Sequence, residues 1–197
     1  MPLLDEPRLL AANPWVARRP LTVTEYHRMG EVGILGERDR VELIEGELVA
    51  MSPIGSYHHG TVISLTQALV LAVGSRALVS VQGPVRLDEY SEPEPDFALL
   101  RPRPDAYRDS HATPADVLLL IEVADTSLNY DRSVKRALYA RSAIPELWIV
   151  DLPAGEVEVC RQPEPDGYVE VQRIGSGSTL EPALLPGVRI ETATLFR

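Results

Sequence analysis

The sequence predicts an α/β fold: a mixed central β-sheet flanked by helices, with an N-terminal hairpin and a C-terminal β-hairpin. Two segments, 117–124 (VLLLIEVA) and 146–151 (ELWIVD), are almost uninterrupted apolar runs, which is typical of strands in the middle of a sheet covered on both faces. Two other segments, at about 57–73 and about 131–142, repeat apolar residues at helical spacing. The helices are therefore expected to pack on the sheet in layers.

The composition fits one globular domain. A chain of 197 residues, 45% hydrophobic and 24% charged, can bury a sizeable core without disulfides. Its single cysteine, Cys160, excludes an internal disulfide and suits a reducing cytoplasm. No apolar run approaches a membrane span, and the N-terminus lacks the order of a secretory signal. We expect a cytoplasmic protein with an extended arm at 1–21 and a single domain at 22–197.

The first elements after the arm are a helix and a hairpin. Thr22 and Glu25 have the spacing of a capping box and predict a short helix at about 22–32. Segment 41–51 (VELIEGELVAM) alternates about Glu45-Gly46, which predicts a β-hairpin.

The later elements follow from alternation, helical spacing and turn residues. The helix at about 57–73 has Ser56 as its expected N-cap. Beyond it we expect strands at 77–82, 84–89 and 96–101, a surface loop at 101–116, a hairpin formed by 155–161 and 168–174, and a closing strand with a short terminal helix within 184–196.

Two features of the charged residues bear on function: the net charge and the use of lysine. The net charge of −10 argues against a protein whose whole surface grips nucleic acid, because such affinity comes largely from cations that meet phosphates. It leaves room for a local basic groove or a transient substrate. The chain also has 18 arginines and a single lysine, Lys135. Arginine and lysine differ in hydration and donor geometry, so a chemical step can require the lysine; chance is the other explanation.

Glu122 and Asp96 are the candidate metal ligands. Glu122 interrupts an apolar strand, where an ionised carboxylate needs a cation, a metal or a proton. The alternative is that it lies at the strand end and points into solvent. Asp96 opens the strand at 96–101, so two neighbouring strands each offer a carboxylate near a sheet end. Such a pair suits Mg²⁺ or Mn²⁺.

Lys135 lies on the helix that follows the Glu122 strand. Val134, Ala137, Leu138 and Arg141 share one face of that helix, and we expect its apolar face to lie against the sheet. Lys135 borders this face, and its long stem can carry the ammonium toward Glu122. The alternative is an ordinary surface lysine on an amphipathic helix.

Four segments together resemble the Uma-two family of restriction-type endonucleases, which belongs to the PD-(D/E)XK nuclease superfamily. The likeness runs from about Thr22 to Phe196 and implies a restriction-endonuclease-like fold. The segments, in chain order, are EPEPDF (92–97), LLLIEVADTS (118–127), DRSVKRALYA (131–140) and IPELWIVD (144–151).

The resemblance implies roles for individual residues. Asp96 matches the aspartate of the PD motif and Glu122 the acidic residue of the (D/E)XK motif. The lysine of that motif is absent, since Ala124 stands in its place. In this family the lysine is found on the following helix, where Lys135 stands. This departure bears on catalytic competence, because the amine must reach the same point from a different backbone position.

The resemblance also points to the hairpin carboxylates Glu42 and Glu47 and to His58. The residues alone favour another interpretation. Alternation places Glu42 opposite the apolar side of its strand. We therefore expect the hairpin carboxylates Glu42, Glu45 and Glu47 to be solvent-exposed charges. His58 shares a helical face with apolar residues and reads as a buried, satisfied histidine somewhat more than as a site residue.

The combined expectation is an Mg²⁺-dependent endonuclease. Asp96, Glu122 and the backbone carbonyl of Val123 would hold one Mg²⁺ (or Mn²⁺), and Lys135 would orient water or stabilise charge at phosphorus. Glu42 and His58 are secondary catalytic candidates. The expected partner is nucleic acid, with DNA as the first choice, and its binding is transient. A second copy of the chain is expected in a homodimer. The alternatives are an inactive nuclease-fold binding or structural module and a small-nucleotide phosphoesterase.

Overall fold

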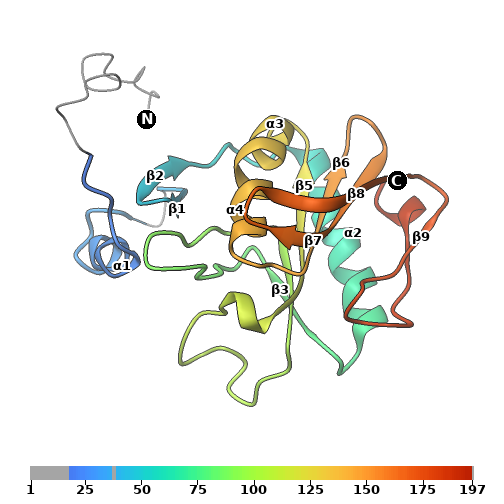
Figure 1. The fold of residues 1–197 in the computed structure, drawn as a ribbon, viewed down its shortest axis with the longest axis horizontal. Coiled ribbons are helices and arrows are strands. Elements are labelled where there is room, and N and C mark those ends of the chain that lie inside the picture. Colours follow the sequence, from blue (N-terminus) through green and yellow to red (C-terminus); the bar gives the residue numbers. More distant parts are fainter. Residues whose placement is uncertain (1–17, 37–38, 197) are drawn as a thin grey trace.

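The computed structural model describes residues 18–36 and 39–196, arranged around a six-stranded sheet (Figure 1). The strand order is β3-β4-β5-β6-β7-β8. β5 and β6 are parallel and every other neighbouring pair is antiparallel, so the predicted mixed sheet is confirmed. The strands are β3 (Leu78–Val81), β4 (Phe97–Leu100), β5 (Val117–Ala124), β6 (Glu146–Asp151), β7 (Glu156–Glu164) and β8 (Gly167–Gly175).

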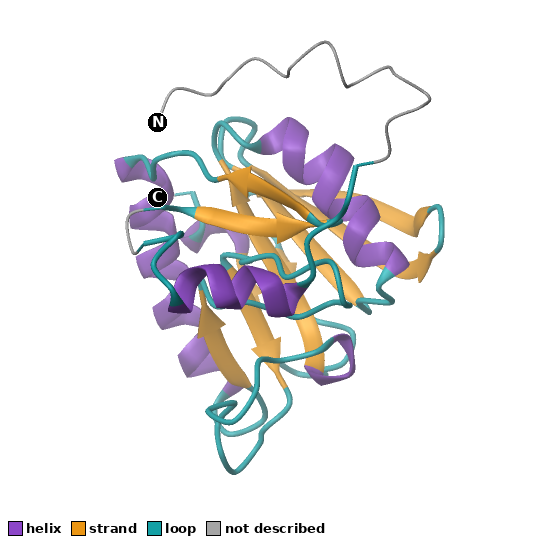
Figure 2. Ribbon diagram, turned by 90° about the vertical axis from the view of Figure 1, so that its left-hand side faces the viewer, coloured by secondary structure: helices purple, strands orange, loops and turns teal. Residues whose placement is uncertain are grey.

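Helices cover both faces of this sheet, as Figure 2 shows. α2 (Ser56–Val73) packs on one face, and the run α3 (Leu128–Tyr130), η2 (Asp131–Lys135) and α4 (Arg136–Arg141) packs on the other. The two-residue period of β5 divides its side chains between these layers. Leu119, Ile121 and Val123 join the α2 core, whereas Leu120 and Ala124 join the α4 core. Glu122 therefore points toward the α4 layer.

The N-terminal elements are a helix and a hairpin that lie outside the six-stranded sheet. α1 (Val23–Glu31) begins at the Thr22–Glu25 capping box, as predicted. β1 (Val41–Ile44) and β2 (Glu47–Ala50) form the predicted hairpin. Its turn residues Glu45 and Gly46 have φ of 50° and 79°, the backbone that a two-residue turn of this hand requires. A Cβ on Gly46 would lie 2.3 Å from Pro20 Cβ, so only glycine fits there.

The C-terminal region also follows the prediction. β7 and β8 form the expected hairpin. β10 (Ile190–Glu191) is the closing strand and pairs with β9 (Thr179–Leu180). The short terminal helix is a single 3-10 turn, η3 (Thr192–Thr194), and a similar turn, η1 (Pro114–Asp116), precedes β5.

Two local predictions are wrong. Segment 84–89 is no ladder strand and contributes a single bridge, between Val85 and Ala112. Val85 and Leu87 are buried, so their alternation reflects an extended segment laid on the core, and Pro84 cannot donate to a ladder. Ser56 is the first helical residue of α2 rather than its cap; Gly55 holds that position without a side-chain bond.

The buried face of the helix after β5 also differs from the prediction. Leu138 is buried as predicted, but Val134 and Arg141 are exposed, and Asp131, Lys135 and Tyr139 are buried as well. A π-helical turn spans 131–135, a feature frequent at functional sites. The two buried residues of this turn, Asp131 and Lys135, are charged, and hydrophobic periodicity cannot identify a polar inward face.

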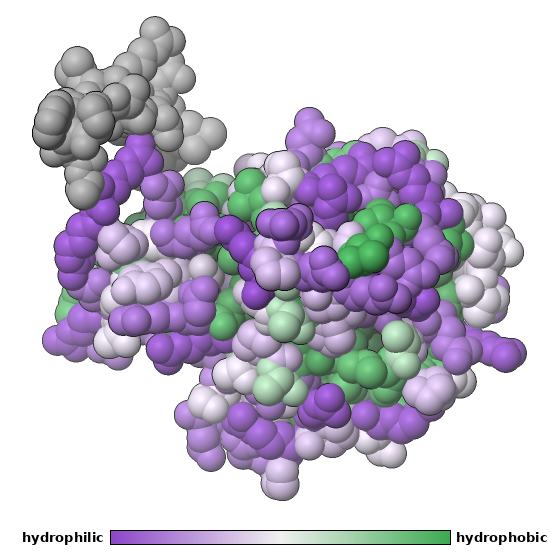
Figure 3. All heavy atoms as spheres, in the orientation of Figure 1, coloured by the Kyte–Doolittle hydropathy of each residue, from purple (hydrophilic) through white to green (hydrophobic). Residues whose placement is uncertain are grey.

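The outer surface and the helices complete the description. On the face drawn in Figure 3, hydrophilic side chains predominate and hydrophobic ones gather in small, separate areas. None of the helices within 18–36 and 39–196 has the length and apolar character needed to span a bilayer. The predicted arm at 1–21 falls almost wholly outside the described residues, which begin at Arg18.

Candidate active site

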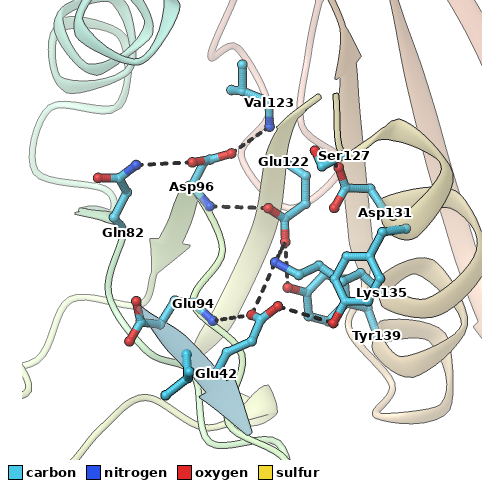
Figure 4. A network of polar contacts seen from close by, with 12 residues as sticks. Glu42, Gln82, Glu94, Asp96, Glu122, Val123, Ser127, Asp131, Lys135 and Tyr139 are labelled. Atoms are coloured by element: carbon cyan, nitrogen blue, oxygen red, sulfur yellow. Dashed lines mark hydrogen bonds and ion pairs between the residues drawn. The ribbon is translucent and has the colours of Figure 1, made fainter. Parts of the chain in front are cut away.

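A pocket of about 290 Å³ lies where β5, α2, the β1–β2 hairpin and η2 meet. Asp96, Glu122 and Lys135 all line it. Figure 4 shows their side chains converging from the strands of the sheet on one side and the helix on the other. The structure thus brings together the three residues that the sequence singled out.

Glu122 is buried within this pocket, with 3% of the residue exposed, so the solvent-facing alternative is wrong. Its Oε1 accepts a hydrogen bond from the Tyr139 hydroxyl at 2.6 Å and lies 3.2 Å from Lys135 Nζ. Its Oε2 accepts a long bond from the Asp96 backbone N–H at 3.4 Å. Burial raises the pKa of Glu122 to about 8, and the negative charges of Asp131 and Asp96 add to this effect while Lys135 opposes it.

Asp96 stands immediately before β4 and faces Glu122 across the strand pair. Its Oδ2 accepts the Val123 backbone N–H at 2.8 Å and lies 3.1 Å from His58 Nε2. Its Oδ1 accepts a weaker bond from Gln82 at 3.3 Å. Burial acts to raise the pKa of Asp96, but the hydrogen bond and charge of His58 and the Val123 N–H outweigh it, so the pKa lies below its usual value.

Lys135 is almost fully buried, with 5% exposed. Its Nζ lies 3.2 Å from Glu122 Oε1 and 3.3 Å from Glu42 Oε2. Burial acts to lower the pKa of this amine, but the carboxylates of Glu122, Glu42 and Asp131 raise it above its usual value. Lys135 is therefore a buried cation shared between two carboxylates.

Glu42 is not the solvated hairpin charge that alternation predicted. It is 2% exposed. Besides the contact with Lys135, its two oxygens accept hydrogen bonds from the Tyr130 hydroxyl and the Glu94 backbone N–H, each at 3.2 Å. Alternation placed Glu42 on the correct side of β1, but η2 and the segment before β4 cover that side. The other two hairpin carboxylates, Glu45 and Glu47, are exposed as expected.

His58 lies at the pocket rather than in the apolar core. It is in the first turn of α2, and its side chain is 14% exposed. The hydrogen bond to Asp96 raises the pKa of His58, although burial acts in the opposite direction. Its Nδ1 is buried and has no hydrogen-bond partner among the described residues.

The structure adds four residues to the site that the sequence did not reveal. Asp131 and Tyr139 precede and follow Lys135 by four positions and share its buried face. That i, i+4 spacing was the available signal. Burial raises the pKa of Asp131 and raises that of Tyr139 well above its usual value. Tyr130 and Glu94 are the others, and both line the pocket.

The charges of the pocket fit a divalent cation. Among the described lining residues, six are acidic, and Arg40 and Lys135 are the two permanent cations. Burying an excess of carboxylates is costly unless positive charge is supplied. Carboxylate oxygens are the ligands that Mg²⁺ and Mn²⁺ prefer. Mg²⁺ is commonly held by one or two carboxylates and keeps several waters, a donor set that Asp96 and Glu122 match.

The fold and this pocket define a class of protein: an α/β protein with a restriction-endonuclease-like fold and a buried carboxylate–lysine cluster at one side of its sheet. The comparisons with known proteins agree on the fold. The chain resembles the crystal structure, at 1.96 Å resolution, of "a putative nuclease belonging to DUF820" from Anabaena variabilis, with a TM-score of 0.67 and 14% identity. The match covers 90% of this chain and 98% of that one.

The family follows from the sequence comparison. Residues 23–193 match the model of the Uma2 family, described as "Putative restriction endonuclease". The chain belongs to the Uma2 family, so the predicted resemblance is confirmed. A comparison with curated proteins gave no match.

Proposed function

We propose that this chain is an endonuclease that hydrolyses phosphodiester bonds in nucleic acid, DNA first, with the help of Mg²⁺ or Mn²⁺. The observation that carries the proposal is the shared pocket of Asp96, Glu122 and Lys135, with the amine 3.2 Å from the Glu122 carboxylate. The family description and the fold support a nuclease.

Asp96 and Glu122, with the backbone carbonyl of Val123, are the residues that would hold the ion. When bound there, Mg²⁺ would supply Lewis-acid activation of a phosphate oxygen and of the attacking water. Asp96 is well prepared for this task, because the hydrogen bonds from Val123 and His58 keep it ionised and oriented. The pKa of Glu122 is raised to about 8 by burial, so a proton competes with the ion for this carboxylate.

Lys135 would act on the reacting phosphate. Its ammonium is held between Glu122 and Glu42, so it is positioned before substrate arrives and needs little reorganisation to stabilise negative charge developing on phosphorus or to orient water. The same contacts bear on the absence of the motif lysine, whose position Ala124 occupies. The amine reaches the Glu122 carboxylate from the following helix although its backbone position differs from that of the (D/E)XK lysine.

Glu42 and His58 would serve as positioning residues. Glu42 anchors the amine on the side away from Glu122, and the Tyr130 hydroxyl and Glu94 N–H fix Glu42 in turn. His58 fixes the Asp96 carboxylate. The predominance of acidic lining and the net charge of −10 favour transient binding of nucleic acid. We also propose that the chain forms a homodimer.

The test is divalent-dependent cleavage of supercoiled plasmid DNA by the purified chain, compared with Asp96→Asn and Lys135→Met. Exposed Glu45→Gln is the matched control. Wild type and control should cleave with Mg²⁺ or Mn²⁺, while each site variant should lose at least on the order of a hundredfold in rate, the scale of one preorganised charge-stabilising contact. If wild type leaves DNA, RNA and branched substrates intact with both ions, the enzymatic proposal fails.

A small-nucleotide phosphoesterase is the second candidate. The acidic lining favours it, since a single small phosphate needs no basic groove. Hydrolysis of nucleotide diesters without cleavage of plasmid DNA would select it. Mn²⁺ titration separates both enzymes from an inactive module. A catalytic site should bind Mn²⁺ and lose it on Glu122→Gln, whereas a degenerate site should bind none.

A further inference from the structure

A second cluster of metal-ligating side chains lies apart from the carboxylate pocket. It consists of His27 on α1, Glu92 in the segment before β4, and His111 in the loop before β5. One ring nitrogen of each histidine and a carboxylate oxygen of Glu92 all lie within 4.8 Å of one another. None of the three lines the carboxylate pocket.

Glu92 is the unusual member of this cluster. The residue is 2% exposed, so its carboxylate is removed from water. Its Oε1 lies 2.5 Å from His27 Nε2, but its Oε2 is buried and has no hydrogen-bond partner among the described residues. A buried carboxylate oxygen without a partner is costly. The His27 contact satisfies one oxygen and leaves the second without a partner, and His111 lies beside His27 with its ring centroid 5.5 Å from that of His27.

The backbone holds the three side chains near one another. Glu92 N donates to the Leu43 carbonyl at 2.7 Å, which ties the segment to β1. The start of α1 is tied to the same segment by the bond from Val23 N to the Glu89 carbonyl at 2.8 Å. Ala112, the residue after His111, is tied to the same segment by the hydrogen bond from Arg86 N to the Ala112 carbonyl, also 2.8 Å long. The cluster thus rests on three connected pieces of backbone.

We propose that His27, Glu92 and His111 form a site for a Zn²⁺ ion, with water completing the coordination. Two imidazoles and one carboxylate are an established donor set for zinc, at bond lengths of about 2.0–2.2 Å. Tetrahedral ligands at such lengths lie about 3.4 Å apart, so His27 has to withdraw from Glu92 by about 1 Å. The His27 side chain is 39% exposed and has room to do so. A bound ion would give the Glu92 carboxylate a cation and fasten α1 to the loop before β5.

The experiment is titration of the full-length chain, free of any polyhistidine tag, with Zn²⁺ by calorimetry and with Co²⁺ by visible absorption. The background carries Asp96→Asn and Glu122→Gln, which removes the two proposed Mg²⁺ ligands of the carboxylate pocket. One ion should bind per chain, and the melting temperature should rise with Zn²⁺ concentration. His27→Ala and His111→Ala should each weaken binding by on the order of tenfold or more, because even the loss of a group that only orients a ligand costs that much.

His59→Ala is the matched control, since His59 is an exposed histidine outside the cluster. It should bind Zn²⁺ like the background protein. His111 is also exposed, so its variant is expected to fold even if His27→Ala does not. Absence of stoichiometric binding, or binding that survives His111→Ala, overturns the proposal. Loss of nuclease activity on Asp96→Asn has no bearing on this result, so the two proposals fail separately.

Discussion

Glu122 and Glu146 are buried carboxylates on adjacent strands, and their surroundings differ sharply. Glu146 on β6 is fully buried and accepts hydrogen bonds from four donors: Trp148 Nε1 at 2.7 Å, Arg161 Nε and Nη2 at 3.0 and 2.9 Å, and Ala183 N at 2.6 Å. Glu122 on β5 has one nearby cation, which it shares with another carboxylate. Burial alone therefore does not mark a functional acid; incomplete compensation of its charge does.

The two environments have different electrostatic consequences. Arg161 places a forked pair of donors, Nε and Nη2, on Glu146 and so compensates its charge directly. Glu122 has a pKa of about 8 because it is buried near Asp131 and Asp96. We interpret Glu146 as a structural group and Glu122 as one held ready to exchange a proton for a metal ion.

The largest expected effect is the contrast between Glu146→Ala and Glu122→Gln. Glu146→Ala leaves the buried Trp148 Nε1 without its acceptor and removes the acceptor of Arg161 Nε and of the Ala183 N–H, so it should lower the free energy of unfolding by up to about 3 kcal/mol. Glu122→Gln replaces a buried carboxyl, whose ionised form burial disfavours, with a neutral group of similar shape, so its cost should stay within about 1 kcal/mol. It should nevertheless abolish Mn²⁺ binding. Urea unfolding and Mn²⁺ titration measure the two outcomes, and a reversed order of stabilities would contradict the interpretation.

The second expected effect is a pH dependence of the metal-free protein. The unfolded chain releases the Glu122 proton near its usual pKa of 4.5, whereas the folded chain holds it to about 8. The folded state binds more protons in that window, so the free energy of unfolding should fall as pH rises from about 5 to about 8. The raised pKa values of Asp131 and Glu94 act in the same direction.

Urea unfolding in the presence of a chelator, at about pH 5 and about pH 8, measures this slope. Glu122→Gln should reduce the slope markedly, and exposed Glu45→Gln should leave it as in wild type. An unchanged slope in Glu122→Gln would mean that Glu122 is ionised throughout the range.

The smallest expected effect concerns two buried tyrosines. The Tyr139 hydroxyl donates to Glu122 at 2.6 Å, and the Tyr168 hydroxyl donates to the Ile144 carbonyl at 3.0 Å. Tyr139→Phe and Tyr168→Phe should each cost about 1–2 kcal/mol of stability. Tyr139→Phe alone should also weaken Mn²⁺ binding, by about tenfold, because its hydrogen bond favours the ionised form of Glu122. Equal Mn²⁺ affinity in both variants would separate Tyr139 from the metal site.

The sequence could predict the parts of this molecule that follow from periodicity. The apolar runs identified β5 and β6, and a carboxylate interrupting the first of them identified Glu122 as a buried acid. The single lysine and its position on the next helix indicated Lys135. These inferences succeed because burial along a strand and the order of elements are local properties of the chain.

The remaining features depend on packing between distant segments. Alternation showed which side of β1 carries Glu42 but not that Tyr130 and Lys135, about ninety residues later, would cover it. The charged inward face of η2 has no hydrophobic signature. The cluster of His27, Glu92 and His111 comes from three segments whose approach is set by backbone bonds between loops, and no spacing in the sequence announces it.

The scarcity of lysine gives this protein a built-in chemical reporter. Because Lys135 is the one lysine of the sequence and is 5% exposed, acylation of a lysine side chain in the native chain can only come from the pocket. The rate of that labelling therefore measures how often the buried amine becomes accessible to solvent, without any engineered probe.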